Sequence, residues 1–87
     1  MTYWFTKKFE KQIDKILDHK LKNEIAFVVI NVEKAKDLRE IKNLKKMEGF
    51  KNAYRIRTGN YRIGVFIESN IVCFAAFHHR KDIYKNF

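Results

Sequence analysis

The sequence predicts an α+β fold in which two N-terminal helices pack on one face of a small antiparallel β-sheet. Residues 53–84 contain three runs with apolar residues at every second position, separated by turn signals at Gly59-Asn60 and Ser69-Asn70, as in a three-stranded antiparallel meander. The N-terminal part instead carries apolar residues at helical spacing. At 87 residues, of which 46% are hydrophobic, the chain is long enough for one core, so we expect a single domain over residues 1–87.

The N-terminal part is expected to contain one strand and two helices. Residues 2–5 are rich in aromatic side chains and suit a strand at the edge of the sheet. Helical spacing begins at Lys7, where Thr6 can cap the first free N–H groups, and resumes after a polar break at residues 18–23 to end near residue 35. β-branched residues near the end of this stretch also permit a strand, but their spacing favours a helix. The apolar positions of the two helices are Phe9, Ile13, Ile16 and Leu17, followed by Leu21, Ile25, Val28, Val29 and Val32.

Residues 37–52 form a basic connector between the second helix and the meander. The apolar residues of this connector recur at intervals of three, which is compatible with one short helical turn or with an extended linker packed on the sheet. Its lysines are either an ordinary solvated surface or an extension of the electrostatic footprint of the hairpin that follows. They are Lys42, Lys45, Lys46 and Lys51.

In the meander, the period of two separates an apolar face from a basic face. Residues such as Ile63 fall on the apolar face, whereas Arg55, Arg57 and Arg62 fall on the other. A two-residue first turn would place Arg57 directly opposite Arg62. Like charges in that position are unfavourable unless an anion lies between them, and a phosphate group would suit the site.

The second turn extends this register to the last strand. It pairs Gly64 with Ala75 and Arg62 with Phe77, which leaves a shallow hollow bordered by arginines and by the rings of Phe66 and Phe77. Cations interleaved with aromatic rings hold single-stranded nucleic acid by charge and stacking, although a solvated sheet face is the alternative. The same count predicts the further pairs Ile63–Ala76, Val65–Phe74 and Phe66–Cys73.

The charge balance restricts the classes of partner. Nineteen Lys and Arg against ten Asp and Glu give a net charge of +9, which favours nucleic acid, an acidic partner or an anionic surface. Apolar runs such as residues 25–30 are too short to span a bilayer, and the first residues do not resemble a signal peptide. A single cysteine, Cys73, cannot form an internal disulfide. We therefore expect a cytoplasmic protein that does not bind membranes.

The adjacent histidines His78 and His79 are the first candidates for a metal site or for proton transfer. Neighbours in a strand point to opposite faces, and further Cys or carboxylate ligands are not close by in sequence, so we expect no metal and no cofactor. The predicted register places His79 on the arginine face and His78 on the core face. A β-bulge near the strand end would exchange them.

Three segments together resemble the RelE/ParE family of toxins from type II toxin-antitoxin systems. They are LKKMEG at residues 44–49, YRIRTGNYRI at residues 54–63 and HRKDIY at residues 79–84. They occur in this order, in a small basic chain, behind two predicted helices. The resemblance implies helices on one face of an antiparallel sheet and RNA on the other, concave face. It also implies cleavage of messenger RNA in the ribosomal A site, neutralised by a cognate antitoxin in a toxin–antitoxin hetero-oligomer.

The resemblance further implies roles for individual residues. Arg55 and Arg57 correspond to basic residues on the strand that enters the site, and Arg62 to the arginine that contacts the scissile phosphate. Tyr84 corresponds to a C-terminal tyrosine, and residues 78–80 fall where the family places its acid. We therefore predict the catalytic residues Arg62, His79, Arg80 and Tyr84, and the RNA-binding residues Arg55, Arg57, Lys45, Lys46 and Phe77.

The chemistry of these side chains agrees with RNA cleavage but leaves other functions open. Arginine is a poor base and a good bidentate clamp for phosphate, whereas histidine can transfer protons at neutral pH. Glutamate is missing from the middle of the arginine strands, since Glu68 lies at the far end by the turn, so positioning by the ribosome is expected to assist catalysis. The alternatives are a ParE-like poison of DNA gyrase and an RNA-binding module without catalysis.

Overall fold

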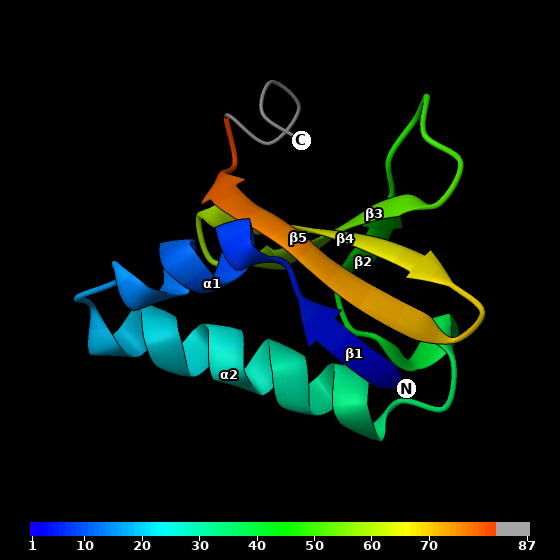
Figure 1. The fold of residues 1–87 in the computed structure, drawn as a ribbon, viewed down its shortest axis with the longest axis horizontal. Helices are drawn as coiled ribbons and strands as arrows, with labels where there is room; N and C mark the ends of the chain where they lie inside the picture. The colour runs from blue at the N-terminus through cyan, green and yellow to red at the C-terminus, as the bar shows by residue number, and fades with distance from the viewer. Residues whose placement is uncertain (82–87) are drawn as a thin grey trace.

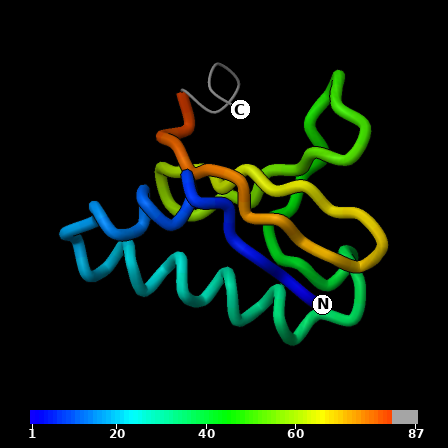
Figure 2. The backbone as a smooth tube through the Cα atoms, in the orientation of Figure 1, coloured from blue at the N-terminus to red at the C-terminus, as the bar shows by residue number. Residues whose placement is uncertain are grey.

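The structure is a computed structural model that describes residues 1–81. Figure 1 shows its elements: strand β1 (Thr2–Phe5), helices α1 (Lys7–Asp14) and α2 (His19–Lys34), a 3₁₀ turn (Leu38–Glu40), and strands β2 (Leu44–Lys46), β3 (Ala53–Thr58), β4 (Tyr61–Glu68) and β5 (Ile71–His79). The strands form one sheet in the order β1-β5-β4-β3-β2. The backbone tube in Figure 2 shows both helices on the same side of this sheet. The predicted fold class is confirmed.

The two edge strands of the sheet differ in part from the prediction. β1 pairs with β5 as expected of an edge strand, but the pairing is parallel, so the sheet is mixed. Both alternatives for the basic connector occur in part: it contains one short helical turn and then an extended segment, strand β2, whose pairing with β3 was not predicted. Three residues are too few for an alternating pattern to indicate a strand.

The helices begin where side chains cap them. The Thr6 hydroxyl accepts a hydrogen bond from the Phe9 N–H at 3.1 Å, and the Asp18 carboxylate accepts one from the Lys20 N–H at 2.9 Å. The predicted break at residues 18–23 is therefore wrong, because α1 has already ended and α2 starts directly after Asp18. Leu17 lies in the connection and is 90% exposed, outside the apolar stripe in which it was placed.

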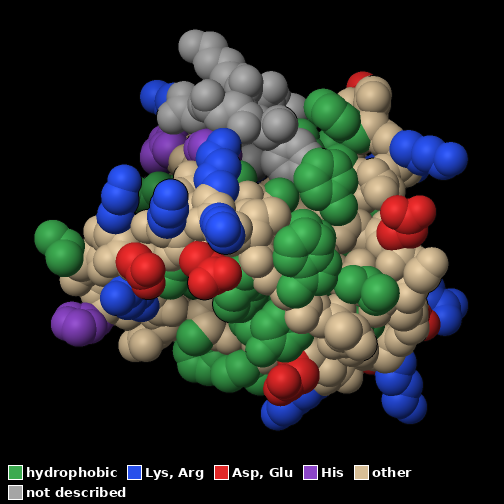
Figure 3. Space-filling view, viewed as in Figure 1, with side chains coloured by type: hydrophobic (Ala, Val, Ile, Leu, Met, Phe, Trp, Pro, Cys, Tyr) green, Lys and Arg blue, Asp and Glu red, His purple; other side chains and the backbone are tan. Residues whose placement is uncertain are grey.

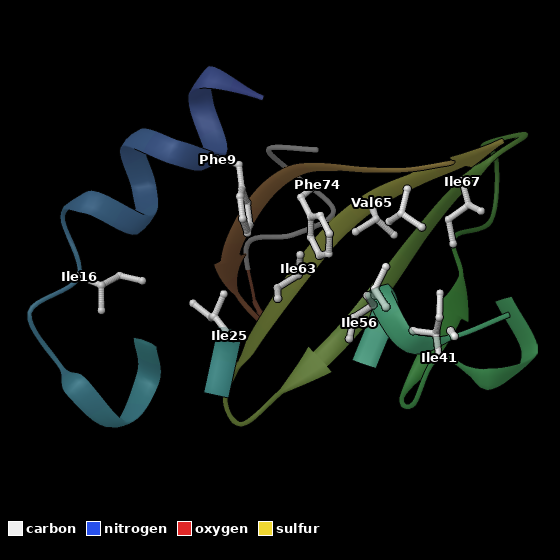
Figure 4. Close-up of a cluster of buried hydrophobic side chains, with 12 residues drawn as sticks. Phe9, Ile16, Ile25, Ile41, Ile56, Ile63, Val65, Ile67 and Phe74 are labelled. Carbon is white, nitrogen blue, oxygen red and sulfur yellow. The ribbon is translucent and has the colours of Figure 1, made fainter. Parts of the chain in front are cut away.

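The main core lies between the helices and the sheet. Figure 4 shows side chains from both helices meeting those of the meander strands, including Phe9 and Ile25 against Ile63 and Phe74. The apolar positions of the meander predicted this face of the sheet, because alternate residues of a strand point to the same side.

The first hairpin has the predicted register throughout. Arg57 lies opposite Arg62, and Arg55 lies opposite Gly64. Gly59 in its turn has φ 58°, in the left-handed region that glycine adopts without a Cβ penalty.

The second hairpin has the predicted register only near its turn. Phe66 pairs with Cys73 and Val65 with Phe74, but Gly64 then pairs with Ala76, which leaves Ala75 as the extra residue of a β-bulge. The predicted pairs Gly64–Ala75, Ile63–Ala76 and Arg62–Phe77 are therefore wrong.

Contacts from the N-terminal segment hold the bulge. The Thr6 hydroxyl donates to the Ala75 carbonyl oxygen at 2.7 Å, and the Thr6 N–H donates to the Phe74 carbonyl oxygen at 3.0 Å. Beyond the bulge, the Gln12 side-chain amide both donates to the Phe77 carbonyl oxygen and accepts from the Phe77 N–H, each at 2.8 Å. The Gln12 side chain of α1 thus pairs with the backbone of β5 beyond the point where β1 ends.

Candidate nucleic-acid interface

The face of the sheet on which none of the described helices packs, called here the helix-free face, carries most of the predicted cationic residues. Arg57 and Arg62 lie on this helix-free face as cross-strand partners, and Lys45 of β2 lies opposite Arg55 of β3. These four side chains line a shallow depression of about 320 Å³. The structure thus brings together Lys45, Arg55, Arg57 and Arg62.

The guanidinium of Arg62 is held over the turn between β3 and β4. Its Nη1 donates to the Gly59 carbonyl oxygen at 3.2 Å and to the Tyr61 carbonyl oxygen at 3.0 Å. These contacts place a permanent positive charge at the end of the hairpin, next to Arg57.

The bulge exchanges the two histidines. His78 lies opposite Arg62, so its side chain belongs to the helix-free face, where its Nε2 atom is buried. His79 lies opposite Tyr61 and packs edge-on against that ring, with 5.6 Å between ring centroids. The predicted placement of His79 beside the arginines is therefore wrong, because Ala75 adds one residue to the strand.

Two further predicted RNA-binding residues lie on the side of the sheet that faces the helices. Phe77 pairs with Ile63 and packs against the core and against Tyr61, with ring centroids 5.1 Å apart. Lys46 pairs with Tyr54, one position out of phase with Lys45. The predicted placement of Phe77 on the arginine face is wrong, because the extra residue Ala75 turns it to the other side.

Arg80 follows β5 directly. Its N–H donates to the Asn60 carbonyl oxygen at 2.9 Å, which holds it beside the first hairpin turn. Its side chain lines a groove together with Arg57 and Arg62. The remaining predicted catalytic residue, Tyr84, lies outside the described residues.

The other end of the helix-free face is apolar, which the sequence reasoning missed. Met47 and Ala53 are buried there with Phe66 packed against them. Trp4 pairs with Cys73 at the edge of the sheet and is 53% exposed beside a hollow of about 540 Å³. The period of two in residues 2–5 could have placed Trp4 on a face only once β1 was known to pair with β5. Figure 3 shows hydrophobic side chains gathered in a band across the surface in view, with basic and acidic side chains around it.

Residues 1–81 contain neither a reactive thiol nor a metal centre. Burial raises the pKa of the Cys73 thiol, which lowers its thiolate fraction and its nucleophilicity at neutral pH. Among these residues, no group of three or more His, Cys, Asp or Glu side chains could hold a metal ion. None of the described helices is long and apolar enough to cross a membrane.

The structure thus defines a class of protein. Its members are small basic α+β proteins in which two helices cover one face of a mixed sheet and a row of arginines lies on the other face. A profile of the ParE toxin of the type II toxin-antitoxin system parDE matches residues 3–84. The chain is 34% identical over 88 residues to Toxin RelE3 of Methanocaldococcus jannaschii, covering 100% of this chain and 99% of that protein. It therefore belongs to the RelE/ParE family of toxins from type II toxin-antitoxin systems.

Solved structures have the same fold. The RelB-RelE antitoxin-toxin complex from Methanococcus jannaschii matches with a TM-score of 0.77 at 32% identity, over 95% of this chain and 96% of that one. The archaeal RelE-RelB complex from Pyrococcus horikoshii OT3 matches with a TM-score of 0.73 at 18% identity, over 91% and 93% of the two chains.

Proposed function

We propose that this toxin is a RelE-like endoribonuclease that cleaves messenger RNA on translating ribosomes. The observation that carries the proposal is the row formed by Arg57, Arg62 and His78 on three neighbouring strands. Two fixed cations beside a group that transfers protons near neutral pH are the side chains that phosphodiester cleavage requires.

The cations stabilise the transition state. The 2′-hydroxyl of the RNA gives its proton to solvent water and attacks the adjacent phosphorus. The bond from phosphorus to the 5′-oxygen breaks and that oxygen takes up a proton, leaving a cyclic phosphate and a free 5′-hydroxyl. Negative charge develops on the non-bridging oxygens, where Arg57 and Arg62 form charge-assisted hydrogen bonds. Lys45 and Arg55 hold the neighbouring phosphates in the shallow depression.

His78 transfers the proton to the leaving 5′-oxygen. Histidine is the side chain suited to proton transfer near neutral pH, whereas arginine stays charged. His78 takes the role first assigned to His79, because it is the histidine that lies opposite Arg62. Arg80 adds charge at the open end of the row, and a role for Tyr84 rests on the family resemblance.

Translating ribosomes supply positioning that the toxin lacks. A carboxylate base would have to come from the arginine strands, but Glu68 ends β4 at the far turn, where it accepts a hydrogen bond from Asn52 at 3.3 Å. Alignment of the 2′-hydroxyl with the leaving oxygen can replace much of what a dedicated base provides. The toxin therefore acts in the cytoplasm, where messages are translated.

A cognate antitoxin is the protein partner. The structures that match this fold are largely toxin–antitoxin complexes, and the RelE chain at 32% identity is bound to RelB. A protein that covers the cationic face would prevent RNA from entering, so we propose a toxin–antitoxin hetero-oligomer as the stored form.

Primer extension on a reporter message in a purified translation system tests the proposal. Wild-type protein should cut only when ribosomes are translating. Arg62→Ala should lower cleavage by about 10²–10³, because it removes one charged donor from the transition state. His78→Gln should lower it by about 10²-fold or more, whereas the adjacent His79→Gln should stay close to wild type. Circular dichroism melts would establish that the variants are folded.

The competing function is inhibition of DNA gyrase, which the match to a ParE profile favours. Growth arrest without RNA cleavage, together with accumulation of cleaved DNA in a supercoiling assay with purified gyrase, would establish that function instead. Equal loss of cleavage in His78→Gln and His79→Gln would remove the specific role assigned to His78.

A further inference from the structure

The apolar end of the helix-free face contains a hollow that the proposed cleavage chemistry does not use. This hollow, called here the Trp4 hollow, has a volume of about 540 Å³. Trp4 of β1 and Phe66 of β4 stand on either side of Cys73 of β5, because Cys73 pairs with both of them. The hollow is further lined by Asn52, Glu68 and Ile71.

The Trp4 hollow has the shape of a site for a planar ring. Neighbouring strands lie about 4.8 Å apart, so the backbones at Trp4 and Phe66, two strands from each other, are separated by about 10 Å. Between them Cys73 contributes only a small side chain to the floor. Trp4 is 53% exposed, which leaves much of its indole open to a second ring. An aromatic surface of this kind binds nucleobases by stacking, because every base has a π-face.

The hollow lies in the path of an RNA strand bound at the arginines. Arg62, Gly64 and Phe66 are alternate residues of β4, so they lie on the same face of the sheet. At about 3.3 Å per residue, Phe66 lies about 13 Å along β4 from Arg62. Arg55 pairs with Gly64, so a cation lies between the two ends. A strand with its scissile phosphate at Arg62 can therefore place a neighbouring phosphate at Arg55 and a base in the hollow.

The polar rim of the hollow can distinguish bases. The Asn52 side-chain amide donates to the Glu68 carboxylate at 3.3 Å, which holds this carboxylate at the rim. A carboxylate accepts from the amino group of cytosine and repels the carbonyl oxygen that uracil carries at the same position. Its negative charge also repels phosphate, so a base fits here better than the RNA backbone. An apolar protein segment fits less well, because it would remove water from the carboxylate without replacing its hydrogen bonds.

We propose that the Trp4 hollow is a nucleobase subsite for messenger RNA, in which a base stacks on the Trp4 indole and presents its amino group to Glu68. This inference rests on the proposed function, from which the identity of the RNA as the message comes. The subsite fixes the register of the strand over the arginines. Cleavage then depends on a base at some distance from the scissile phosphate.

Fluorescence anisotropy with short RNA tests the stacking. The probes are cytidine octamers and abasic octamers, which have the same length and charge. Wild-type toxin should bind the cytidine octamer at least fivefold more tightly. Trp4→Leu, which keeps an apolar side chain but removes the ring, should abolish this difference, whereas Trp4→Phe should retain most of it. Equal affinity of the wild type for both octamers, or binding of neither, would overturn the proposal.

Two controls separate stacking from charge and from folding. Trp4→Leu should leave the slope of log affinity against log salt concentration unchanged, because the indole carries no charge. Leu17→Ala, which removes an exposed apolar side chain from the connection between the helices, should change neither the affinity nor the slope. Urea unfolding would establish that the variants are folded. A preference for bases that survives in folded Trp4→Leu would refute the role of Trp4.

Uridine octamers test the polar rim. Wild-type toxin should bind the cytidine octamer about fivefold more tightly than the uridine octamer, because only cytosine offers an amino group to Glu68. Glu68→Ala should bring this ratio close to one while leaving the preference for bases over abasic RNA. A ratio that Glu68→Ala does not change would contradict the contact assigned to Glu68.

A cross-linking experiment identifies the RNA. Ile71 lines the hollow and is 43% exposed, so p-benzoylphenylalanine at position 71 leaves Trp4 in place. On irradiation with translating ribosomes, this toxin should capture the message, and capture of ribosomal RNA or of a protein would overturn that assignment. Trp4-dependent binding of cytidine octamers by a toxin that cleaves no message would reject the nuclease function and support base binding in the hollow. Cleavage by a toxin without base-dependent binding would reject the subsite alone.

Discussion

We expect Gln12 to stabilise the fold more than an ordinary helix residue does, because its side chain forms the hydrogen bonds with β5 that a neighbouring strand would otherwise form. Its amide forms two hydrogen bonds of 2.8 Å with the backbone of Phe77, both partly buried. Gln12→Ala removes both partners and leaves an N–H and a carbonyl of β5 unsatisfied. At about 1 kcal/mol for each bond, the loss is about 2 kcal/mol. A small domain has a total stability of roughly 5–15 kcal/mol, so this loss is readily measured.

Urea unfolding followed by circular dichroism measures this effect. Gln12→Ala should lower the midpoint with an unchanged m-value, and the melting temperature should fall by about 8–16 °C. Lys11→Ala, an exposed change in the same turn of α1, is the matched control. A difference of less than about 0.5 kcal/mol between the two variants would refute the role of Gln12, since ordinary surface substitutions fall within that range.

Gln12→Glu tests the direction of each hydrogen bond. A carboxylate can still accept from the Phe77 N–H, but its second oxygen faces the Phe77 carbonyl oxygen and repels it. Only the protonated acid restores the donor, so folding raises the pKa of this group above its unfolded value of about 4.3. The variant should therefore match wild type below that pH and lose stability as pH rises through the folded pKa. A pH-independent difference would contradict this geometry.

Three further predictions follow from the structure. Arg57→Ala should weaken the binding of single-stranded RNA, measured by fluorescence anisotropy, and should reduce the slope of log affinity against log salt concentration by about 0.7. Lys46→Ala, on the other face of the sheet, should leave this slope unchanged. Since burial raises the pKa of the Cys73 thiol, iodoacetamide at pH 8 should alkylate folded protein more slowly than protein unfolded in urea; equal rates would contradict it. Gly59→Ala should cost about 1 kcal/mol, because φ is 58° and the added Cβ approaches Glu24, and unchanged urea unfolding would show that the turn relaxes freely.

Much of the fold could be predicted because its information is local. The alternation along residues 53–74 and the Gly59-Asn60 turn predict the first hairpin pair by pair, including Arg57 opposite Arg62. The helical spacing predicts which side chains of α2 face the core. Strand β2 was not predicted because three residues are too few to show a period. Leu17 was misplaced because α1 ends at Asp14 and Asp18 caps the start of α2, which leaves Leu17 in the connection.

The composition of the candidate site was only partly predictable, since it depends on which residues share a face. Arg55, Arg57 and Arg62 follow from the period of two and from a hairpin turn of known type. Phe77 and His79 were assigned to the wrong face because a single extra residue reverses every side chain beyond it. The bulge that supplies this residue has no clear local signature among small side chains.

The sequence by itself determined the class of fold, the basic character of one sheet face and the two facing arginines, because charge, periodicity and turn chemistry act between near neighbours. Only the tertiary structure decided that His78, and not His79, joins those arginines. That choice depends on Thr6 and Gln12, whose hydrogen bonds to Ala75 and Phe77 connect segments more than sixty residues apart in the chain. Such contacts exist only after β1 and α1 have packed against β5, so a pattern within the strand cannot reveal them.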